Sequence, residues 1–403
     1  GPGMLILLIG TGLYLTVGLR FYTFRNIFSA FSMLWKGRTS SAGDKGELTP
    51  FNALMTALAG TIGTGSIVGV ATAILSGGPG ALFWVWVSAF FGMATIYAEA
   101  VLAQRYRTTV NGKVTGGPAY YIRAAFKGTF GKVLAGVFSV LIILALGFMG
   151  NMVQSNSIGE ACQNAFHIPP LTTTLVLTAL AALIVLRKNA TVKSLDVMVP
   201  IMAVCYFVLT VGILVVNFRQ LPAVLGRIFA EAFGLRQMAA GGFGAVLMNG
   251  VKRGLFSNEA GSGSAPCAAA AAACDDPVKM GFVQALGVLI DTVVICSCTA
   301  FLMLLVPQDL TAGLSGMDLL QTAMQYHLGG FGTVFIAATL ALFSFSTFLG
   351  VLYYARSNVA YLCGDNWWSQ TVYKLIALVM LLIGGLQAYT VVWDLGDVGI
   401  GLM

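Results

Sequence analysis

The polar residues that interrupt apolar runs are the residues most able to do chemistry in this chain. They include Gln154, Asp291 and the adjacent hydroxyls of Ser346 and Thr347. If the runs cross a membrane, such residues are costly and are functional candidates by default. Their amide, carboxylate and hydroxyl oxygens suit a polar solute or a hard monovalent cation. Three roles stay open for Asp291: cation ligand, proton carrier, or hydrogen-bonding residue between helices.

Two glycine-rich segments lie half a chain apart, Gly-Thr-Gly-Ser at 63–66 and Gly-Ser-Gly-Ser at 261–264. Glycine inside a helix costs about 1 kcal/mol relative to alanine, so both segments predict broken helices. A broken helix frees N–H groups that attract a carboxylate, and carbonyls that suit a cation. In a bilayer such backbone must face protein or a cavity. The repeated pattern predicts two related halves, each beginning with a broken helix.

Segment 254–261, Gly-Leu-Phe-Ser-Asn-Glu-Ala-Gly, places polar residues beside the second break. Ser257 and Asn258 would offer side-chain oxygens to a cation or a substrate amine, and Phe256 would form an apolar lid. The alternative is that these side chains only hydrogen-bond the broken helix to its neighbours.

Glu259 belongs to the same segment and is harder to place. The basic residues near it along the chain are Lys252 and Arg253. We expect Glu259 to form a structural ion pair with one of them.

The composition identifies the environment of the chain. Of 403 residues, 58% are hydrophobic and 9% are charged, and the mean hydropathy is +0.86. Soluble domains carry about 25% charged residues, so this is a membrane protein, expected in the cell membrane. Runs such as 133–147 are apolar all round, which excludes barrel strands. At about 20 residues per span, about ten spans are expected: 4–18, 50–76, 80–104, 130–158, 171–187, 195–217, 242–273, 280–306, 330–358 and 367–388.

The expected fold class is an all-α polytopic bundle in three parts. These are an N-terminal helix and basic connector at 1–49, a five-helix repeat at 50–217 and a second repeat at 242–403. An odd number of spans inverts the second repeat relative to the first. The chain ends at Met403, so the last helix is expected to be truncated. With the connector on the cytoplasmic side, most basic loop residues also fall there, as the positive-inside rule requires.

Other functions have little support in the sequence. The net charge of +7 is scattered with no basic run longer than two, so no nucleic-acid partner is expected. No GxxxxGK[ST] loop for ATP is present. His167 and His327 have no matching acid and nucleophile, so the chain is not expected to be an enzyme. The seven cysteines are interpreted as small core residues, and no cofactor is expected.

At the residues described above the chain resembles the alanine/glycine:cation symporter family, also called the sodium:alanine symporters. The similarity covers nearly the whole chain, and the motifs that carry it lie in order at 63–74, 77–84, 116–121, 150–157 and 254–261.

The resemblance implies an inverted five-plus-five bundle like that of the sodium-coupled leucine transporters, with broken first and sixth core helices. It also implies alternating access, a small neutral amino acid such as alanine or glycine as substrate, and sodium as coupling ion. The substrate residues that it implies are Thr64, Gly65, Gln154, Phe256, Ser257 and Asn258. The sodium residues that it implies are the carbonyls near Ala59 and Ile62, with Ser346 and Thr347.

Two departures from the family pattern are visible. Ser66 stands where the family commonly has Asn, and an alanine-rich stretch at 268–273 stands where it often shows a His. Ion choice or stoichiometry can therefore differ. Proton coupling through Asp291 or Glu259, and a non-transporting amino-acid sensor, stay as alternatives, and the oligomeric state is not predicted.

Overall fold

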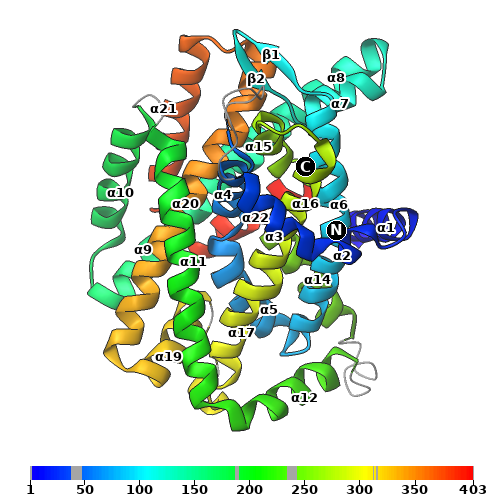
Figure 1. Ribbon diagram of the computed structural model, residues 1–403. Coiled ribbons are helices and arrows are strands. Elements are labelled where there is room, and N and C mark those ends of the chain that lie inside the picture. The colour runs from blue at the N-terminus through cyan, green and yellow to red at the C-terminus, as the bar shows by residue number, and fades with distance from the viewer. Residues whose placement is uncertain are drawn as a thin grey trace.

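This computed structural model describes residues 2–37, 48–186, 190–233, 243–311, 313–314 and 316–402. The first half of the described chain is helical apart from one β-hairpin (Figure 1). Its elements are α1 (Pro2–Gly18), α2 (Tyr22–Arg25), α3 (Ile27–Gly37), α4 (Pro50–Thr61), the π-helix η1 (Gly65–Gly69), α5 (Val70–Gly77), α6 (Ala81–Arg105), β1 (Thr108–Val110), β2 (Lys113–Thr115), α7 (Pro118–Ala125), α8 (Gly128–Ile142), the π-helix η2 (Ile143–Gly150), α9 (Asn151–Phe166), α10 (Pro170–Val185) and α11 (Ala190–Val216).

The second half is helical throughout its described part. Its elements are the 3₁₀ turn η3 (Phe218–Gln220), α12 (Leu221–Ala232), α14 (Phe243–Asn258), α15 (Ala265–Ala271), α16 (Pro277–Val288), the π-helix η4 (Leu289–Ile295), α17 (Cys296–Leu304), α18 (Gln308–Thr311), α19 (Gly316–Leu328), α20 (Gly330–Cys363), α21 (Trp367–Gly384) and α22 (Tyr389–Leu402). Helix α22 covers residues where the sequence analysis expected the last helix only to begin. The division into two five-helix repeats stays a prediction.

Both glycine-rich segments break a helix, as predicted. Helix α4 ends at Thr61 and the chain turns by 51° before the helical segment Gly65–Gly77. Helix α14 ends at Asn258 and α15 begins at Ala265. In the second break Gly261 and Gly263 have φ of 89° and 79°, a left-handed conformation that glycine adopts without steric cost.

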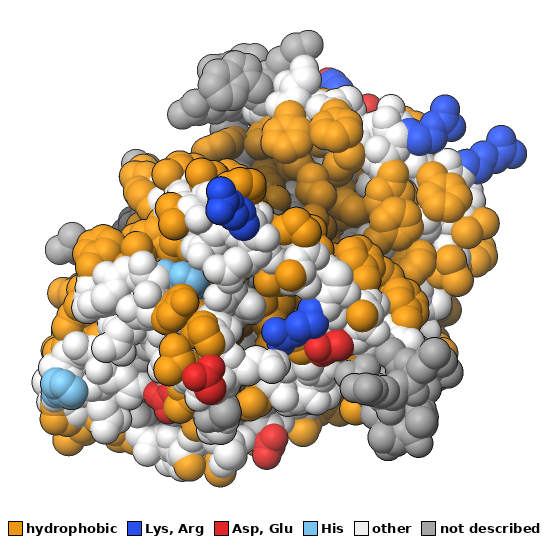
Figure 2. Space-filling model, turned by 90° about the horizontal axis from the view of Figure 1, so that it is seen from below, with side chains coloured by type: hydrophobic (Ala, Val, Ile, Leu, Met, Phe, Trp, Pro, Cys, Tyr) orange, Lys and Arg blue, Asp and Glu red, His pale blue; other side chains and the backbone are white. Residues whose placement is uncertain are grey.

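Six described helical segments are long and apolar enough to cross a membrane, and the bent pair around Gly63 makes up to seven. Because α1 and α10 are shorter and α14 and α15 are separated by a break, this number is lower than the ten expected. The six segments are Ala81–Arg105, Gly128–Phe166, Val197–Val216, Pro277–Leu304, Gly330–Cys363 and Trp367–Gly384. Figure 2 views the molecule from below, at one end of the helix bundle, and shows apolar side chains over much of this end with several Lys, Arg, Asp and Glu side chains among them.

The broken helices lie in the middle of the bundle, while α1 and α10 lie at opposite edges (Figure 1). Helix α20 packs on α4, and both pack on α15. The approach of α20 to α4 needs glycine, because a Cβ at Gly350 would lie 2.9 Å from the Gly60 nitrogen. The two broken helices are also joined at one end, where Leu48 N donates to Ala271 O at 3.1 Å. The breaks are therefore held side by side.

Candidate functional site

A small cavity lies where the two breaks meet. The first break, η2, α9, α14, the start of the second break, α20 and α22 all contribute residues to its wall. The wall residues that can contact a polar solute are Thr64, Gly65, Gln154, Phe256, Glu259 and Thr347. The structure thus brings together residues from opposite ends of the sequence, and four of them are substrate residues implied by the family resemblance.

The first break leaves little room for side chains other than those present. A Cβ at Gly65 would lie 3.2 Å from the Phe256 ring and 3.3 Å from the Ser257 Cα. A Cβ at Gly63 would collide with Thr347 Oγ1. Glycine here lets a ligand reach the freed backbone of the first break.

Three side-chain oxygens on the cavity wall are buried without a hydrogen-bond partner. They are Thr64 Oγ1, Gln154 Oε1 and Glu259 Oε2. A buried polar atom left unpaired costs about 1–3 kcal/mol, so these atoms indicate a place that a ligand completes.

Helix α20 reaches the first break through Thr347. Its hydroxyl donates to Phe343 O at 3.0 Å and contacts Ile62 O at 3.4 Å. Ser346, its neighbour, donates to Phe343 O within its own helix at 2.8 Å. Ala59 is fully buried one turn earlier on α4. Of the four expected sodium residues, the structure therefore joins Ile62 and Thr347 directly.

A second oxygen-rich cluster surrounds Asp291, which lies in η4 and is fully buried. Its carboxylate accepts hydrogen bonds from Ser66, from Ser257 at 2.7 Å and from Thr292 at 2.8 Å. Ser66 also donates to Thr61 O at 3.0 Å. One carboxylate, three hydroxyls and one carbonyl are hard oxygen donors, which suit a cation such as sodium.

The sequence reasoning did not assemble this cluster. It left three roles open for Asp291, treated Ser66 only as a departure from the family pattern, and placed Ser257 with the substrate residues. The signal in the sequence was that Ser66 and Ser257 each lie beside a predicted break.

All three π-helices border either the cavity or this cluster, and π-helical turns occur frequently at functional sites.

Asn258 lies away from the cavity. Its Oδ1 accepts from Ala260 N at 3.0 Å, and its side chain lies against Gly92 of α6. Ser257 likewise faces Asp291 rather than the cavity wall. The hydrogen bonds of Ser257 and Asn258 therefore match the alternative interpretation, in which these side chains hold the broken helix in place.

The expected ion pair of Glu259 is wrong. Lys252 and Arg253 both contact Asp397 of α22, at 2.6 and 2.9 Å. Both side chains project from α14 toward α22. The Arg253 guanidinium also lies 5.7 Å from the Phe256 ring centre.

The same group closes one side of the cavity. Phe256 and Trp393 stack with ring centres 5.6 Å apart, and the Arg253 guanidinium lies 5.3 Å from the Trp393 ring centre. Asp397 holds Arg253 there. The lid expected of Phe256 is therefore part of a larger aromatic and ionic closure.

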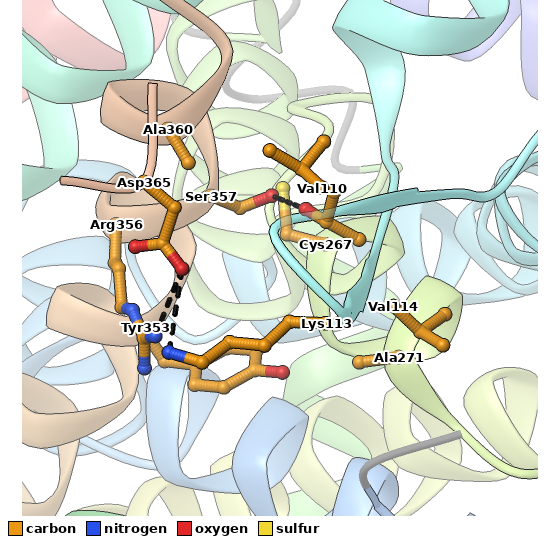
Figure 3. A pocket seen from close by; sticks show the side chains of 11 residues that line it. Val110, Lys113, Val114, Cys267, Ala271, Tyr353, Arg356, Ser357, Ala360 and Asp365 are labelled. Carbon is orange, nitrogen blue, oxygen red and sulfur yellow. Dashed lines mark hydrogen bonds and ion pairs between the residues drawn. The ribbon is translucent and has the colours of Figure 1, made fainter. Parts of the chain in front are cut away.

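A second pocket lies where the β-hairpin, α15 and the end of α20 meet (Figure 3). Asp365 contacts Lys113 at 3.3 Å and Arg356 at 3.6 Å. The Ser357 hydroxyl lies 3.1 Å from that of Thr115. The hairpin turns at Asn111 and Gly112, both at positive φ, as a two-residue hairpin loop requires.

The pattern of the sodium:alanine symporter family matches residues 1–403. The chain belongs to this family. It is 38% identical to the amino-acid carrier protein AlsT of Bacillus subtilis, over 98% of this chain and 83% of AlsT. It is also 38% identical to the sodium/alanine symporter AgcS of Methanococcus maripaludis, over 100% of this chain and 89% of AgcS.

A solved structure shares the fold. The crystal structure of MhsT in complex with L-phenylalanine superposes with a TM-score of 0.62 at 14% identity, covering 85% of this chain and 80% of MhsT. This symporter-family chain is a multi-pass protein of the cell membrane, and it is an amino-acid transporter rather than an enzyme.

Proposed function

We propose that this chain imports small neutral amino acids, alanine and glycine, in symport with sodium by alternating access. The observation that carries the proposal is the cavity between the two breaks, whose wall holds unpartnered buried oxygens beside freed backbone. A cavity of this kind fits a small zwitterion, because a half-helix start attracts a carboxylate and side-chain oxygens accept from an ammonium. The name of AgcS, a sodium/alanine symporter, supports the same substrate class.

In this proposal the substrate carboxylate binds N–H groups near Thr64 and Gly65. Gln154 binds a polar group of the substrate, and Phe256 covers its small side chain. Ser257 and Asn258 act from behind the cavity, by holding the second break in place, since their hydrogen bonds point away from the cavity wall.

Two places are proposed for sodium. The first combines the carbonyls near Ala59 and Ile62 with Ser346 and Thr347; the Thr347 contact to Ile62 O supports it. The second is the Asp291 cluster, which supplies a negative charge and four further oxygens. In both, the donors are oxygen atoms, as a hard cation prefers.

Proteoliposomes that contain the purified chain test the proposal. Uptake of labelled alanine is measured under an inward sodium gradient, under a potassium gradient and under a pH gradient without sodium. We expect uptake only with sodium, and competition by glycine that exceeds competition by glutamine. Absence of sodium-dependent uptake of both alanine and glycine would overturn the proposal.

Proton coupling is the second candidate, because Asp291 is a buried carboxyl group inside the bundle. In that case uptake follows the pH gradient and ignores sodium. The Asp291→Asn variant then loses the response to the pH gradient, because an amide cannot carry the proton.

A further inference from the structure

Glu259 is an acidic residue placed at the cavity by the second break. Its φ of 53° is left-handed, and the residue is 5% exposed on the cavity wall. Oε2 of its carboxyl group is buried and has no hydrogen-bond partner. The unusual backbone conformation and the buried oxygen both belong to this one residue.

No basic side chain among the described residues forms an ion pair with Glu259. Lys252 and Arg253, one to two turns earlier on α14, are both held by Asp397. A buried carboxylate without a counter-charge is strongly unfavourable. Glu259 therefore either carries a proton or pairs with a positive charge that reaches Oε2 through the cavity.

The neighbouring oxygens indicate which kind of cationic group fits beside Glu259. Thr64 Oγ1 and Gln154 Oε1 lie on the same wall and are also buried without partners. An ammonium group carries three N–H donors. Three acceptors around one small cavity, one of them a carboxylate, match an ammonium in both number and charge.

We propose that Glu259 binds the ammonium group of the substrate, together with Thr64 and Gln154. The inference rests on the proposed function and adds the rule by which the site recognises its substrate. The first break binds the negative end of the zwitterion and Glu259 binds the positive end. A 2-hydroxy acid of the same shape, such as L-lactate, offers no positive charge to Glu259 and is rejected, as is N-acetyl-L-alanine.

The test measures equilibrium binding of L-alanine, L-lactate and N-acetyl-L-alanine to the purified full chain in sodium. In the wild-type chain we expect alanine to bind and neither analogue to compete. Glu259→Gln keeps the shape and removes the charge, and we expect it to weaken alanine binding by about tenfold or more, since a hydrogen bond to a charged group contributes about 1.5–3 kcal/mol.

Glu160→Gln is the matched control. Glu160 Oε2 is also buried without a partner, but the residue lies on α9 outside the cavity wall. This variant is expected to bind alanine within twofold of the wild type.

The outcomes separate the two proposals. No alanine or glycine binding or uptake by the wild type overturns the proposed function and this inference together. Wild-type binding with an unchanged E259Q overturns the inference alone, and so does lactate competing as well as alanine. If E259Q lowers the sodium response and leaves alanine affinity intact, Glu259 serves the cation instead and the inference is wrong. If E259Q does not fold, two other measurements test the inference. One is the competition by the analogues on the wild-type chain. The other is the Glu259→Asp variant, which keeps the charge and is expected to retain rejection of lactate.

Discussion

The two helix breaks look alike in sequence but differ in how their polar backbone is satisfied. At the first break the contact from another helix is long, 3.4 Å from Thr347 Oγ1 to Ile62 O. At the second, Ala260 N is bound by the Asn258 side chain, Gly261 N by Glu99 at 3.2 Å and Glu259 O by the Ser262 hydroxyl at 2.6 Å. The second break is closed by its own side chains and by α6, whereas the first has fewer such contacts among the described residues, from Ser66 to Thr61 O at 3.0 Å and the long one from Thr347.

This difference assigns different tasks to the two breaks. Backbone that already has partners has little left to offer a ligand, so the second break acts mainly through side chains such as Glu259. The first break offers backbone groups themselves, which glycine leaves accessible. Variants at the first break should therefore change ligand binding, while many variants at the second should change stability.

Gly65→Leu is expected to have the largest effect, a complete loss of substrate binding. Its side chain would enter the space between the breaks, because even a Cβ there lies 3.2 Å from the Phe256 ring. Binding of labelled alanine to the purified chain measures the effect. The matched control is Gly212→Leu on α11, where a Cβ meets nothing within 4 Å. Retained binding in Gly65→Leu would show that the ligand does not use this backbone.

Asp291→Asn removes the one charge that both breaks share, through Ser66 and Ser257. We expect the sodium concentration needed for half-maximal uptake to rise by about 10- to 100-fold, since a hydrogen bond or contact to a charged group contributes about 1.5–3 kcal/mol. The control is Asp309→Asn on α18, where the aspartate is exposed. An unchanged sodium dependence would leave the Thr347 region as the place for the coupling ion.

Gln154→Ala and Asn258→Ala sharpen the comparison directly. Sequence reasoning alone expects both to lower substrate affinity. In the structure Gln154 faces the cavity, whereas Asn258 holds the backbone of the second break. We expect Gln154→Ala to weaken alanine binding about tenfold, the lower end of the range for a hydrogen bond to a charged group such as the substrate ammonium, with an unchanged thermal unfolding midpoint.

For Asn258→Ala we expect a lower unfolding midpoint first, with any loss of affinity following from it. Binding titration and thermal unfolding of the same samples distinguish the two variants. If Asn258→Ala weakened binding more than Gln154→Ala at an unchanged midpoint, Asn258 would be a direct ligand and the comparison of the breaks would fail.

The breaks themselves were predictable from sequence, because glycine in mid-membrane is unfavourable without a structural reason. The Asp291 cluster was not, since Ser66 and Ser257 are 191 residues apart and meet only through packing of the broken helices. The partner of Lys252 was missed for the same reason. The sequence analysis paired Lys252 or Arg253 with Glu259 because Glu259 is the nearby acidic residue in the sequence. In the structure, α14 instead brings Lys252 to Asp397, 145 residues later. Local spacing gives the helices, and the pairing of distant side chains depends on how the helices cross.

Thr347→Ala and Ser346→Ala test the smallest difference, between two adjacent hydroxyls. Thr347 reaches across to Ile62 O of the first break, while Ser346 bonds within its own helix. At 3.4 Å the Thr347 contact is long for a hydrogen bond, so we expect its loss to raise the half-maximal sodium concentration only about twofold to threefold. Ser346→Ala is expected to leave it unchanged, because Ser346 turns its hydroxyl onto the carbonyl one turn back. Equal effects of both variants would mean that sodium draws the two hydroxyls away from Phe343 O, and that the first break has more ligands for the ion than its own contacts show.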